Sequence, residues 1–196
     1  MKISKLIMTI MMFWSAIAFA KDETVNLGTI VLSPTRLSES RYSVGTSVDV
    51  LGSDDMDAAV NERITDGFFT IPGVRVKQAN GLGGLTTIRI RGLRSIDTKF
   101  MLDGLPFRDP SDPQGSANPL LLDLMEGGIG RVEITRGTGS ALWGSDAQAG
   151  AVALYTKRGA GTPRANGGFE FGSRDTVREY VELEGAVNGF DFYNRL

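Results

Sequence analysis

The sequence has no cysteine and no histidine among its 196 residues. The absence of cysteine excludes disulfide bonds and thiol nucleophiles. The absence of histidine excludes Ser-His-Asp triads, and without either residue type most zinc sites are excluded as well. Without cysteine and histidine, the chain cannot form the commonest arrangements of catalytic residues.

The sequence also lacks a strong charge of either sign. It has 21 lysines and arginines against 23 acidic residues, for a formal net charge of −2. Nucleic-acid-binding domains are typically strongly basic, so this balance gives no support to that class. Apart from 25 glycines, the composition is ordinary for a folded domain.

Long apolar runs are absent after the first 20 residues, so no later segment predicts a transmembrane helix. Residues 1–20 read as a secretory signal peptide. Lys2 and Lys5 form its basic start, residues 6–17 its apolar centre and Ala18-Phe19-Ala20 its cleavage site. A membrane anchor helix is the alternative, but the apolar run is short for a span.

The stretch 131–159, RVEITRGTGSALWGSDAQAGAVALYTKRG, organises the rest of the chain. Alternation around Val132 and Ile134 predicts a half-buried strand, and residues 151–156 predict a buried one. The glycines between them favour a sharp turn. A phosphate-binding loop fails here, because neither G-x-G-x-x-G nor Gly-Lys-Ser/Thr is present and no clear helix follows.

Several elements are predicted before this stretch. Residues 47–51 form a strand, 54–60 a short helix, and a second helix begins near Asn61 with Ile64, Phe68 and Ile71 on its buried side. Pro72-Gly73 ends that helix and a strand follows. Residues 86–91 form another strand and 99–107 a hairpin that turns at Asp103-Gly104. Residues 78–85 and 108–118 are loops, and 120–125 are compatible with a helix.

Asp103, Asp109 and Asp112 invite a calcium interpretation. Their spacing does not fit an EF-hand loop, so the sequence favours a solvated, turn-rich loop and no metal or other cofactor.

From Asn166 onward, residues alternate between apolar and polar in segments of about ten residues. Val177, Val181 and Leu183, for example, share one face. Such segments separated by turns are typical of outer-membrane barrel strands. An ordinary meander of strands is the alternative that pattern alone leaves open.

Four ordered pieces of the central stretch carry a resemblance: Arg131-Val132-Glu133, Arg136-Gly137, Trp143-Gly144-Ser145 and Thr156-Lys157-Arg158. With the Pro72-Gly73-Val74, Ile90-Arg91-Gly92 and Asp103-Gly104 motifs, the chain resembles the plug domain of TonB-dependent outer-membrane transporters. One departure is Ala147-Gln148-Ala149-Gly150, where the family usually has a second glycine-rich pair.

A second resemblance lies nearer the N-terminus. Residues 28–36, GTIVLSPTR, are similar to the TonB box with its flank, although Gly28 replaces an acidic residue and Pro34 an alanine. A mobile, β-prone segment can add as a strand to a partner's sheet edge. The resemblance implies that the TonB C-terminal domain binds one short segment: Thr29, Ile30, Val31, Leu32 and Ser33.

The resemblance implies an α+β fold, a plug with a small mixed β-sheet, short helices and long loops, followed by the start of an antiparallel outer-membrane β-barrel. The expected organisation is a signal peptide over 1–20, a flexible N-terminal segment over 21–42, the plug over 43–158 and the barrel start over 159–196. The implied function is the gate and ligand-contact module of an outer-membrane receptor, not an enzyme. Its implied ligand is a scarce chelate or cofactor such as a ferric siderophore, haem or cobalamin, and the inner-membrane TonB complex supplies energy.

The resemblance also assigns roles to individual residues. Arg91 and Arg136 correspond to arginines that pair with glutamates of the barrel wall and seat the plug; as solvated strand-end arginines they would have no such role. By position, ligand contacts fall in three loops, on Asn80, Gly81, Leu82, Ser95, Asp97, Arg108, Asp109, Ser111 and Asp112.

Only two or three strands follow the plug, whereas a membrane barrel must close. The sequence therefore predicts a truncated form or fragment that is not a working channel alone. The alternative is a stand-alone periplasmic binding or interaction domain with a plug fold. The expected location is the outer membrane, or the periplasm if the barrel is absent.

Overall fold

The computed structural model describes residues 30–32, 35–53, 55, 63–79, 84–122, 128–172 and 177–196. The predicted signal peptide lies outside these residues, as do Thr29, Ser33, residues 80–82 and all of the predicted helix over 54–60 except Asp55.

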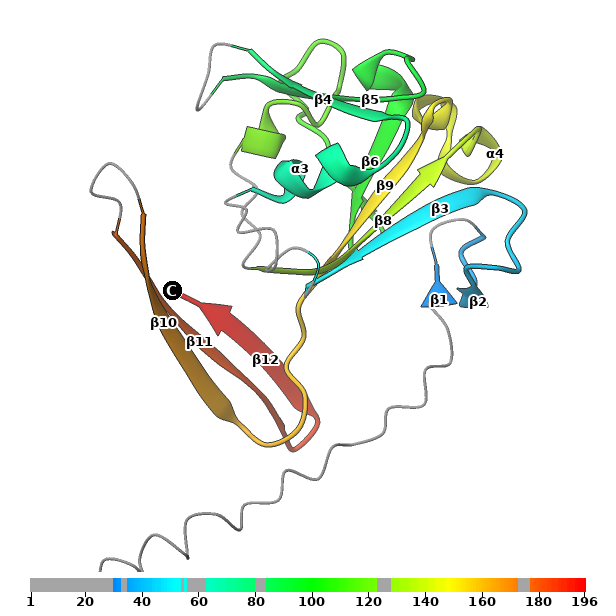
Figure 1. Cartoon of the computed structure of the whole chain (residues 1–196). Coiled ribbons are helices and arrows are strands. Elements are labelled where there is room, and N and C mark those ends of the chain that lie inside the picture. Colours follow the sequence, from blue (N-terminus) through cyan, green and yellow to red (C-terminus); the bar gives the residue numbers. More distant parts are fainter. Residues whose placement is uncertain are drawn as a thin grey trace, which may run out of the picture.

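A five-stranded mixed sheet forms the centre of the fold (Figure 1). Its strands, in spatial order, are β3 (Ser47–Gly52), β8 (Ile129–Arg136), β9 (Gly150–Thr156), β6 (Thr98–Leu102) and β7 (Leu105–Pro106). Only the β6–β9 pair is parallel. The predicted strands over 47–51, 131–136 and 151–156 are therefore confirmed, with β8 starting two residues earlier than expected.

The predicted hairpin between β6 and β7 is confirmed, with Asp103-Gly104 as its turn. Asp103 has φ +48° and Gly104 φ +83°, so both central residues are left-handed, as a two-residue type I′ turn requires. The Asp103 carboxylate accepts hydrogen bonds from the backbone N–H of Thr156, at 3.0 Å, and from its hydroxyl, at 2.8 Å. The turn is thereby tied to the end of β9.

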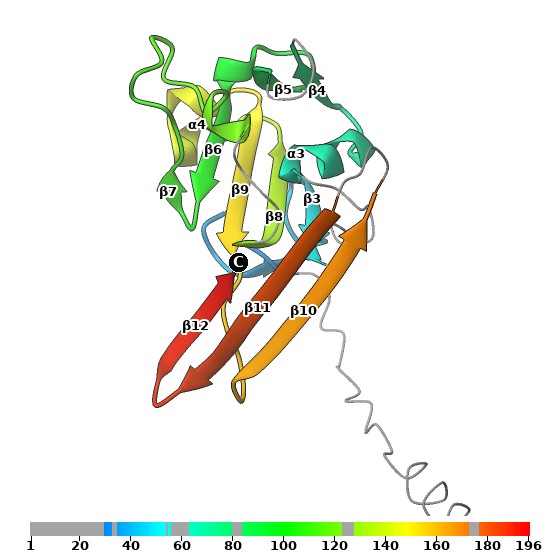
Figure 2. The same cartoon turned by 90° about the vertical axis from the view of Figure 1, so that its left-hand side faces the viewer.

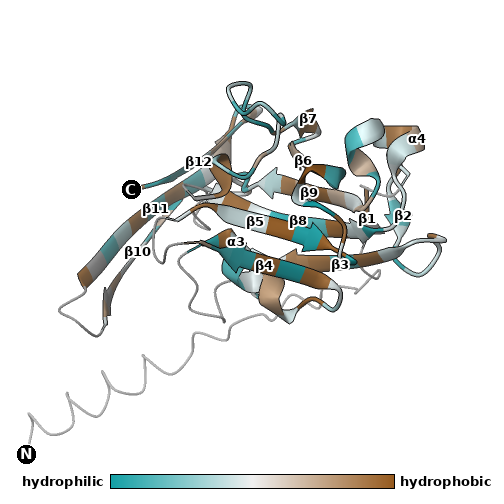
Figure 3. Ribbon diagram, turned by 90° about the horizontal axis from the view of Figure 1, so that it is seen from above, coloured by the Kyte–Doolittle hydropathy of each residue, from teal (hydrophilic) through white to brown (hydrophobic). Residues whose placement is uncertain are grey.

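Short helices and one hairpin cover the first face of the sheet. They are α3 (Ile64–Gly67), η1 (Phe68–Thr70), β4 (Val74–Gln78), β5 (Thr86–Ile90), η2 (Ser95–Asp97) and η3 (Leu120–Leu122). Ile64, Phe68 and Ile71 are buried, as the helical spacing predicted. They pack with Ile88 of β5 and Ile134 of β8 in the main core. Bands of hydrophobic and polar residues alternate along β4 and β8 (Figure 3), so each of these strands has one apolar face.

The second face of the sheet is covered by the N-terminal segment. There β1 (Ile30–Val31) pairs antiparallel with β2 (Glu39–Ser40), close to β3 (Figure 1). Two short helices, α4 (Ser140–Trp143) and η5 (Ser145–Ala147), fill the connection between β8 and β9. The sequence predicted a flexible segment over 21–42 and no clear helix after Gly139. α4 differs from the second expectation, because tertiary contacts order this connection. The flexibility of 21–42 stays a prediction, and its described residues include the paired strands β1 and β2.

The last part of the chain is a separate three-stranded antiparallel sheet (Figure 2). It consists of β10 (Arg164–Phe171), β11 (Val177–Val187) and β12 (Phe190–Arg195), with β11 in the middle. Large apolar side chains such as Phe169, Phe171 and Phe190 are more than 70% exposed on it. The predicted α+β class, with a small mixed sheet, short helices and long loops followed by antiparallel strands, is confirmed.

Candidate functional site

Residues 30–32, the described part of the partner-binding segment predicted over residues 29–33, lie against the sheet of their own domain. The Val31 side chain is fully buried. The backbone N–H of Leu32 donates a 2.9 Å hydrogen bond to Oε2 of Glu133, which lies 101 residues later on β8. The segment thus occupies a defined position on the second face.

A second contact anchors the same segment after Leu32. Arg36 adopts a left-handed backbone conformation, with φ +61°. Its guanidinium lies over the ring of Trp143, 4.3 Å from the ring centroid, and donates to the carbonyl oxygen of Leu142. A cation over a partly exposed aromatic ring such as that of Trp143 contributes about 0.5–1 kcal/mol. The segment is therefore joined to both β8 and α4.

Arg136 is one of the two arginines predicted to seat the plug. In the structure its side chain is bound by other residues of the plug itself. Its Nη2 lies 2.6 Å from Oδ2 of Asp49 on β3 and donates to the Ser47 hydroxyl at 2.7 Å. Its Nη1 donates to the carbonyl oxygen of Pro72 at 2.5 Å. The side chain is 16% exposed. The alternative, that Arg136 is a solvated strand-end arginine, is therefore wrong, because β3 and the loop after η1 enclose the end of β8.

Arg91, the other predicted seating residue, is exposed. Its backbone is left-handed, with φ +52°, and its N–H donates to the Gly73 carbonyl at 2.7 Å. The expectation that Arg91 is solvated therefore fits the structure. The same short loop, at Pro72 and Gly73, contacts both arginines, so it places Arg91 beside Arg136.

The residues predicted to contact a ligand fall into three groups. Asn80, Gly81 and Leu82 lie outside the described residues. Ser95 and Asp97 form the ends of η2, where Asp97 is buried and accepts from Arg94 Nη2 at 2.9 Å. The hydrogen bonds from the Arg94 side chain lower the pKa of Asp97. Its carboxylate is therefore a structural cap rather than a free ligand contact.

The third group lies on the loop after β7. The Asp109 carboxylate accepts from both the N–H and the hydroxyl of Ser111. Asp112 accepts from the N–H of Gln114 and from Ser116, whose hydroxyl is the main cause of the lowered pKa of Asp112. These are local turns that fix the shape of the loop. Arg108 and Ser111 are exposed on this loop and Asp109 is half-buried; their ligand-contact role stays a prediction.

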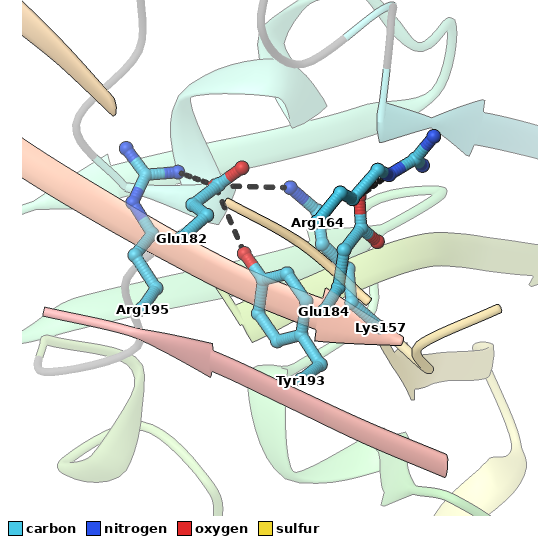
Figure 4. Close-up of polar contacts among 6 residues, drawn as sticks. All are labelled: Lys157, Arg164, Glu182, Glu184, Tyr193 and Arg195. Carbon is cyan, nitrogen blue, oxygen red and sulfur yellow. Dashed lines mark hydrogen bonds and ion pairs between the residues drawn. The ribbon is translucent and has the colours of Figure 1, made fainter. Parts of the chain in front are cut away.

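A polar cavity of about 350 Å³ lies where the plug meets the three-stranded sheet. Its lining includes Thr156 and Lys157 from the end of β9 and Glu182 and Tyr193 from β11 and β12. Figure 4 shows Glu182 at the centre of this network, accepting from Tyr193 at 2.9 Å and from Arg195 at 3.0 Å, with Lys157 Nζ at 3.8 Å. Glu184 of β11 pairs in turn with Arg164 of β10 at 2.6 Å, so the ion pairs around this cavity join the end of β9 to the three-stranded sheet.

Across the described residues, no three acidic side chains gather where they could share a metal ion. None of the described helices has both the length and the apolar composition that crossing a membrane requires.

The contacts of the buried Glu133 were not predicted from the sequence. The sequence presents it only as part of the Arg131-Val132-Glu133 motif. In the structure it pairs with Arg131, at 2.8 Å, and with Leu32. The i, i+2 spacing of Arg131 and Glu133 on one strand face signals their pair, but nothing in the sequence signals the contact with residue 32.

Comparisons with known proteins agree on one family. The model of the TonB-dependent Receptor Plug Domain matches residues 40–151. An iron-regulated outer membrane virulence protein of Vibrio cholerae is 32% identical over 155 residues, which are 76% of this chain and 23% of that protein. The vitamin B12 transporter BtuB of Vibrio vulnificus is 29% identical over 128 residues, or 65% of this chain and 20% of the transporter.

Among solved structures, the ferripyoverdine receptor of the outer membrane of Pseudomonas aeruginosa shares the fold. It matches with a TM-score of 0.69 and 22% identity over 82% of this chain and 20% of that receptor. The ferric preacinetobactin receptor of Acinetobacter baumannii matches with a TM-score of 0.65 and 21% identity, over 82% of this chain and 23% of that one. The chain thus spans about a quarter or less of the length of each of these proteins.

Proposed function

Because the chain belongs to the TonB-dependent receptor plug domain family, we propose that it is the gate and ligand-contact module of an outer-membrane uptake receptor. The observation that carries this proposal is the family match over residues 40–151, which runs from β2 to the start of β9. The cargo class is an iron chelate or a cobalamin-type cofactor. The names of the relatives, an iron-regulated outer membrane protein and a vitamin B12 transporter, support this class. The same relatives are outer-membrane proteins, and this supports an outer-membrane location for this protein.

The energy-coupling partner in this proposal is the TonB C-terminal domain, which binds residues 29–33 as an added strand. The backbone of β1 is already extended in the structure, where Ile30 and Val31 pair with Ser40 and Glu39. Extended backbone with β-branched side chains suits strand addition, in which main-chain hydrogen bonds give the affinity.

Val31→Pro tests the partner. Proline has no N–H to donate to a strand ladder, so we expect capture of the chain by an immobilised TonB C-terminal domain to fall several-fold. Val31→Thr keeps the N–H and the branched side chain, so it serves as the matched control with capture close to wild type. If Val31→Pro only released β1 from its own plug, capture would rise. A fall in capture therefore shows that the hydrogen bonds of the added strand are lost. Equal capture of the proline and threonine variants would rule out strand addition at this segment.

The proposed ligand-contact role belongs to the segments at residues 78–85, 95–98 and 107–115, because connecting segments held by a rigid sheet commonly carry binding. Within 95–98, which forms η2 and the start of β6, Asp97 is left out because Arg94 holds its carboxylate. In a receptor that carries this plug inside its full barrel, shortening the 107–115 loop should weaken ligand binding without loss of membrane insertion. Ligand affinity on whole cells measures this. The control is a shortened 160–163 linker, which lies at the other end of β9. Unchanged affinity with all three loops shortened would show that the plug does not contact the ligand.

Arg91 remains the proposed seating residue toward a surrounding barrel, because its side chain is exposed at the edge of the plug. For Arg136, a glutamate of the barrel wall would have to compete with Asp49 of the plug, which already pairs with the Arg136 guanidinium.

A further inference from the structure

The chain leaves the plug at Lys157, a residue that is held from two sides. Its backbone N–H donates to the carbonyl oxygen of Gly128 at 2.9 Å. A Cβ at Gly130 would lie 3.3 Å from the Lys157 Cα, so the two backbones approach closely at a residue without a side chain. The Lys157 ammonium lies 3.8 Å from Oε1 of Glu182 and 5.4 Å from the centroid of the Tyr193 ring (Figure 4). Lys157 therefore contacts both the plug and the three-stranded sheet.

Gly159 packs directly on the backbone of the three-stranded sheet. It is buried. A Cβ at this position would clash with the carbonyl oxygens of Gly185 and Phe192, and it would lie 2.6 Å from the Gly185 nitrogen. Gly185 and Phe192 are opposite each other in the register of β11 and β12. Because all three atoms belong to paired backbone, a side chain at 159 could be accommodated only by moving the sheet.

A backbone hydrogen bond follows this contact at once. The N–H of Ala186 on β11 donates to the Gly161 carbonyl oxygen at 2.9 Å. Only residues 158–160 thus separate the hydrogen bond on the plug side, at Lys157, from the hydrogen bond on the sheet side. Glycine-rich linkers are commonly flexible. In this linker, Gly159 instead allows the close contact that fixes it.

Glu182 is fixed in place before it meets Lys157. Its Oε1 accepts from the Tyr193 hydroxyl at 2.9 Å and from Nη1 of Arg195 at 3.0 Å. The Arg195 guanidinium lies over the ring of Tyr180, 4.5 Å from its centroid. The side chains of Lys157 and Glu182 are only 18% and 16% exposed. The pair is therefore less screened than an ion pair on the open surface, and its carboxylate is held by neighbours on the sheet.

We propose that residues 157–161 form a rigid joint that fixes the orientation of the three-stranded sheet on the plug, with Lys157 as the positioning residue. The joint meets the polar face of the sheet, on which Glu182 lies. The opposite face carries exposed apolar side chains such as Phe169. The joint thus decides which face of the sheet turns toward the plug. It depends on neither a cargo nor the TonB domain, so it goes beyond the proposed function.

A pair of spin labels measures the orientation of the sheet. The chain has no cysteine, so Gln148→Cys just before β9 and Glu179→Cys on β11 place one pair of labels at two exposed positions. Pulsed electron resonance gives the distribution of distances between them, and we expect a single narrow distribution. Gly159→Ala should give a distribution about twofold wider, because a linker freed from its contact behaves as a flexible coil. Ala160→Ser is the matched control, since it adds one non-hydrogen atom at the exposed neighbouring residue.

A second set of variants tests Lys157 in the same labelled chain. Lys157→Met removes the ammonium and keeps an unbranched side chain, so the distribution should widen as the contacts with Glu182 and Tyr193 are lost. Arg158→Met is the matched control, because it removes one positive charge from the next residue, which is exposed. In a Glu182→Gln background, Lys157→Met should widen the distribution little further, because the partner charge is already absent.

Trypsin tests the joint without any substitution. The enzyme cuts after lysine and arginine, and a folded chain is cut in proportion to its locally opened population. We expect cleavage after Lys157 and Arg158 to be about tenfold slower in the native chain than in a free peptide of residues 153–163. Mass spectrometry of the early fragments measures both rates. Equal rates would show that the linker is open, and would overturn the joint.

The distance measurements have equally definite outcomes. Thermal unfolding should give Gly159→Ala and Ala160→Ser the same melting temperature, which shows that a wider distribution comes from the joint and not from an unfolded plug. A broad distribution in the chain with an unaltered joint, or equal widths for Gly159→Ala and Ala160→Ser, overturns the joint. Equal widths for Lys157→Met and Arg158→Met overturn the positioning role of Lys157.

Discussion

Gly150→Ala is expected to unfold the plug. Gly150 starts β9, between Arg136 of β8 and Thr98 of β6, with φ +152°. A Cβ at this position would lie 2.1 Å from the carbonyl oxygen of Thr135 and 3.1 Å from Cδ1 of Ile90. The oxygen belongs to the backbone of a central strand, so relief requires the sheet itself to move. The expected loss is about 4 kcal/mol or more, which belongs to the exceptional class of single substitutions.

Urea unfolding followed by circular dichroism measures this loss as a shift in midpoint. Gly45→Ala is the matched control, because nothing lies within 4 Å of its added Cβ and its φ is not in the left-handed range. The control should stay within about 0.5 kcal/mol of the wild type. An unfolding midpoint of Gly150→Ala equal to that of Gly45→Ala would show that β8 and β9 do not pack as described.

Arg136→Ala is expected to cost about 2–4 kcal/mol of stability. The substitution removes the ion pair with Asp49 and the hydrogen bonds to Ser47 and Pro72. Asp49 is then left largely buried with one remaining cation, Arg41, at 3.0 Å. Breaking a mostly buried pair from one side is costly because the remaining charge loses its compensation. For a chain of this length the melting temperature should fall by roughly 5–15 °C.

Arg91→Ala is the control, since Arg91 is exposed and its backbone hydrogen bond to Gly73 survives the change. It should shift the melting temperature by no more than a degree or two, in line with surface substitutions of about 0.5 kcal/mol. Arg136→Lys should fall between the two, because an ammonium cannot reproduce the fork that spans three acceptors. Equal melting temperatures for Arg136→Ala and Arg91→Ala would show that Arg136 is a solvated strand-end residue.

The sequence by itself determined the family and most of the elements of the plug. The I-R-G, D-G and R-V-E motifs are local, and local pattern sets strand alternation, turn type and helix ends. For this reason the strands predicted over 47–51, over 86–91 and from Arg131 were found within two residues of those bounds, together with the Asp103-Gly104 turn. The absence of cysteine and histidine was equally readable, because it depends on no contact at all.

Only the tertiary structure decided which side chains meet. Arg136 meets Asp49 and Ser47 because β3 pairs antiparallel with β8, a register that neither strand encodes alone. Leu32 meets Glu133 across 101 residues of chain, and Gly150 meets Thr135 through the pairing of β8 with β9. Hydrogen bonds, ion pairs and steric clashes act over a few ångströms. The sequence gives only how far apart two residues are along the chain. How far apart they are in space is decided by the fold.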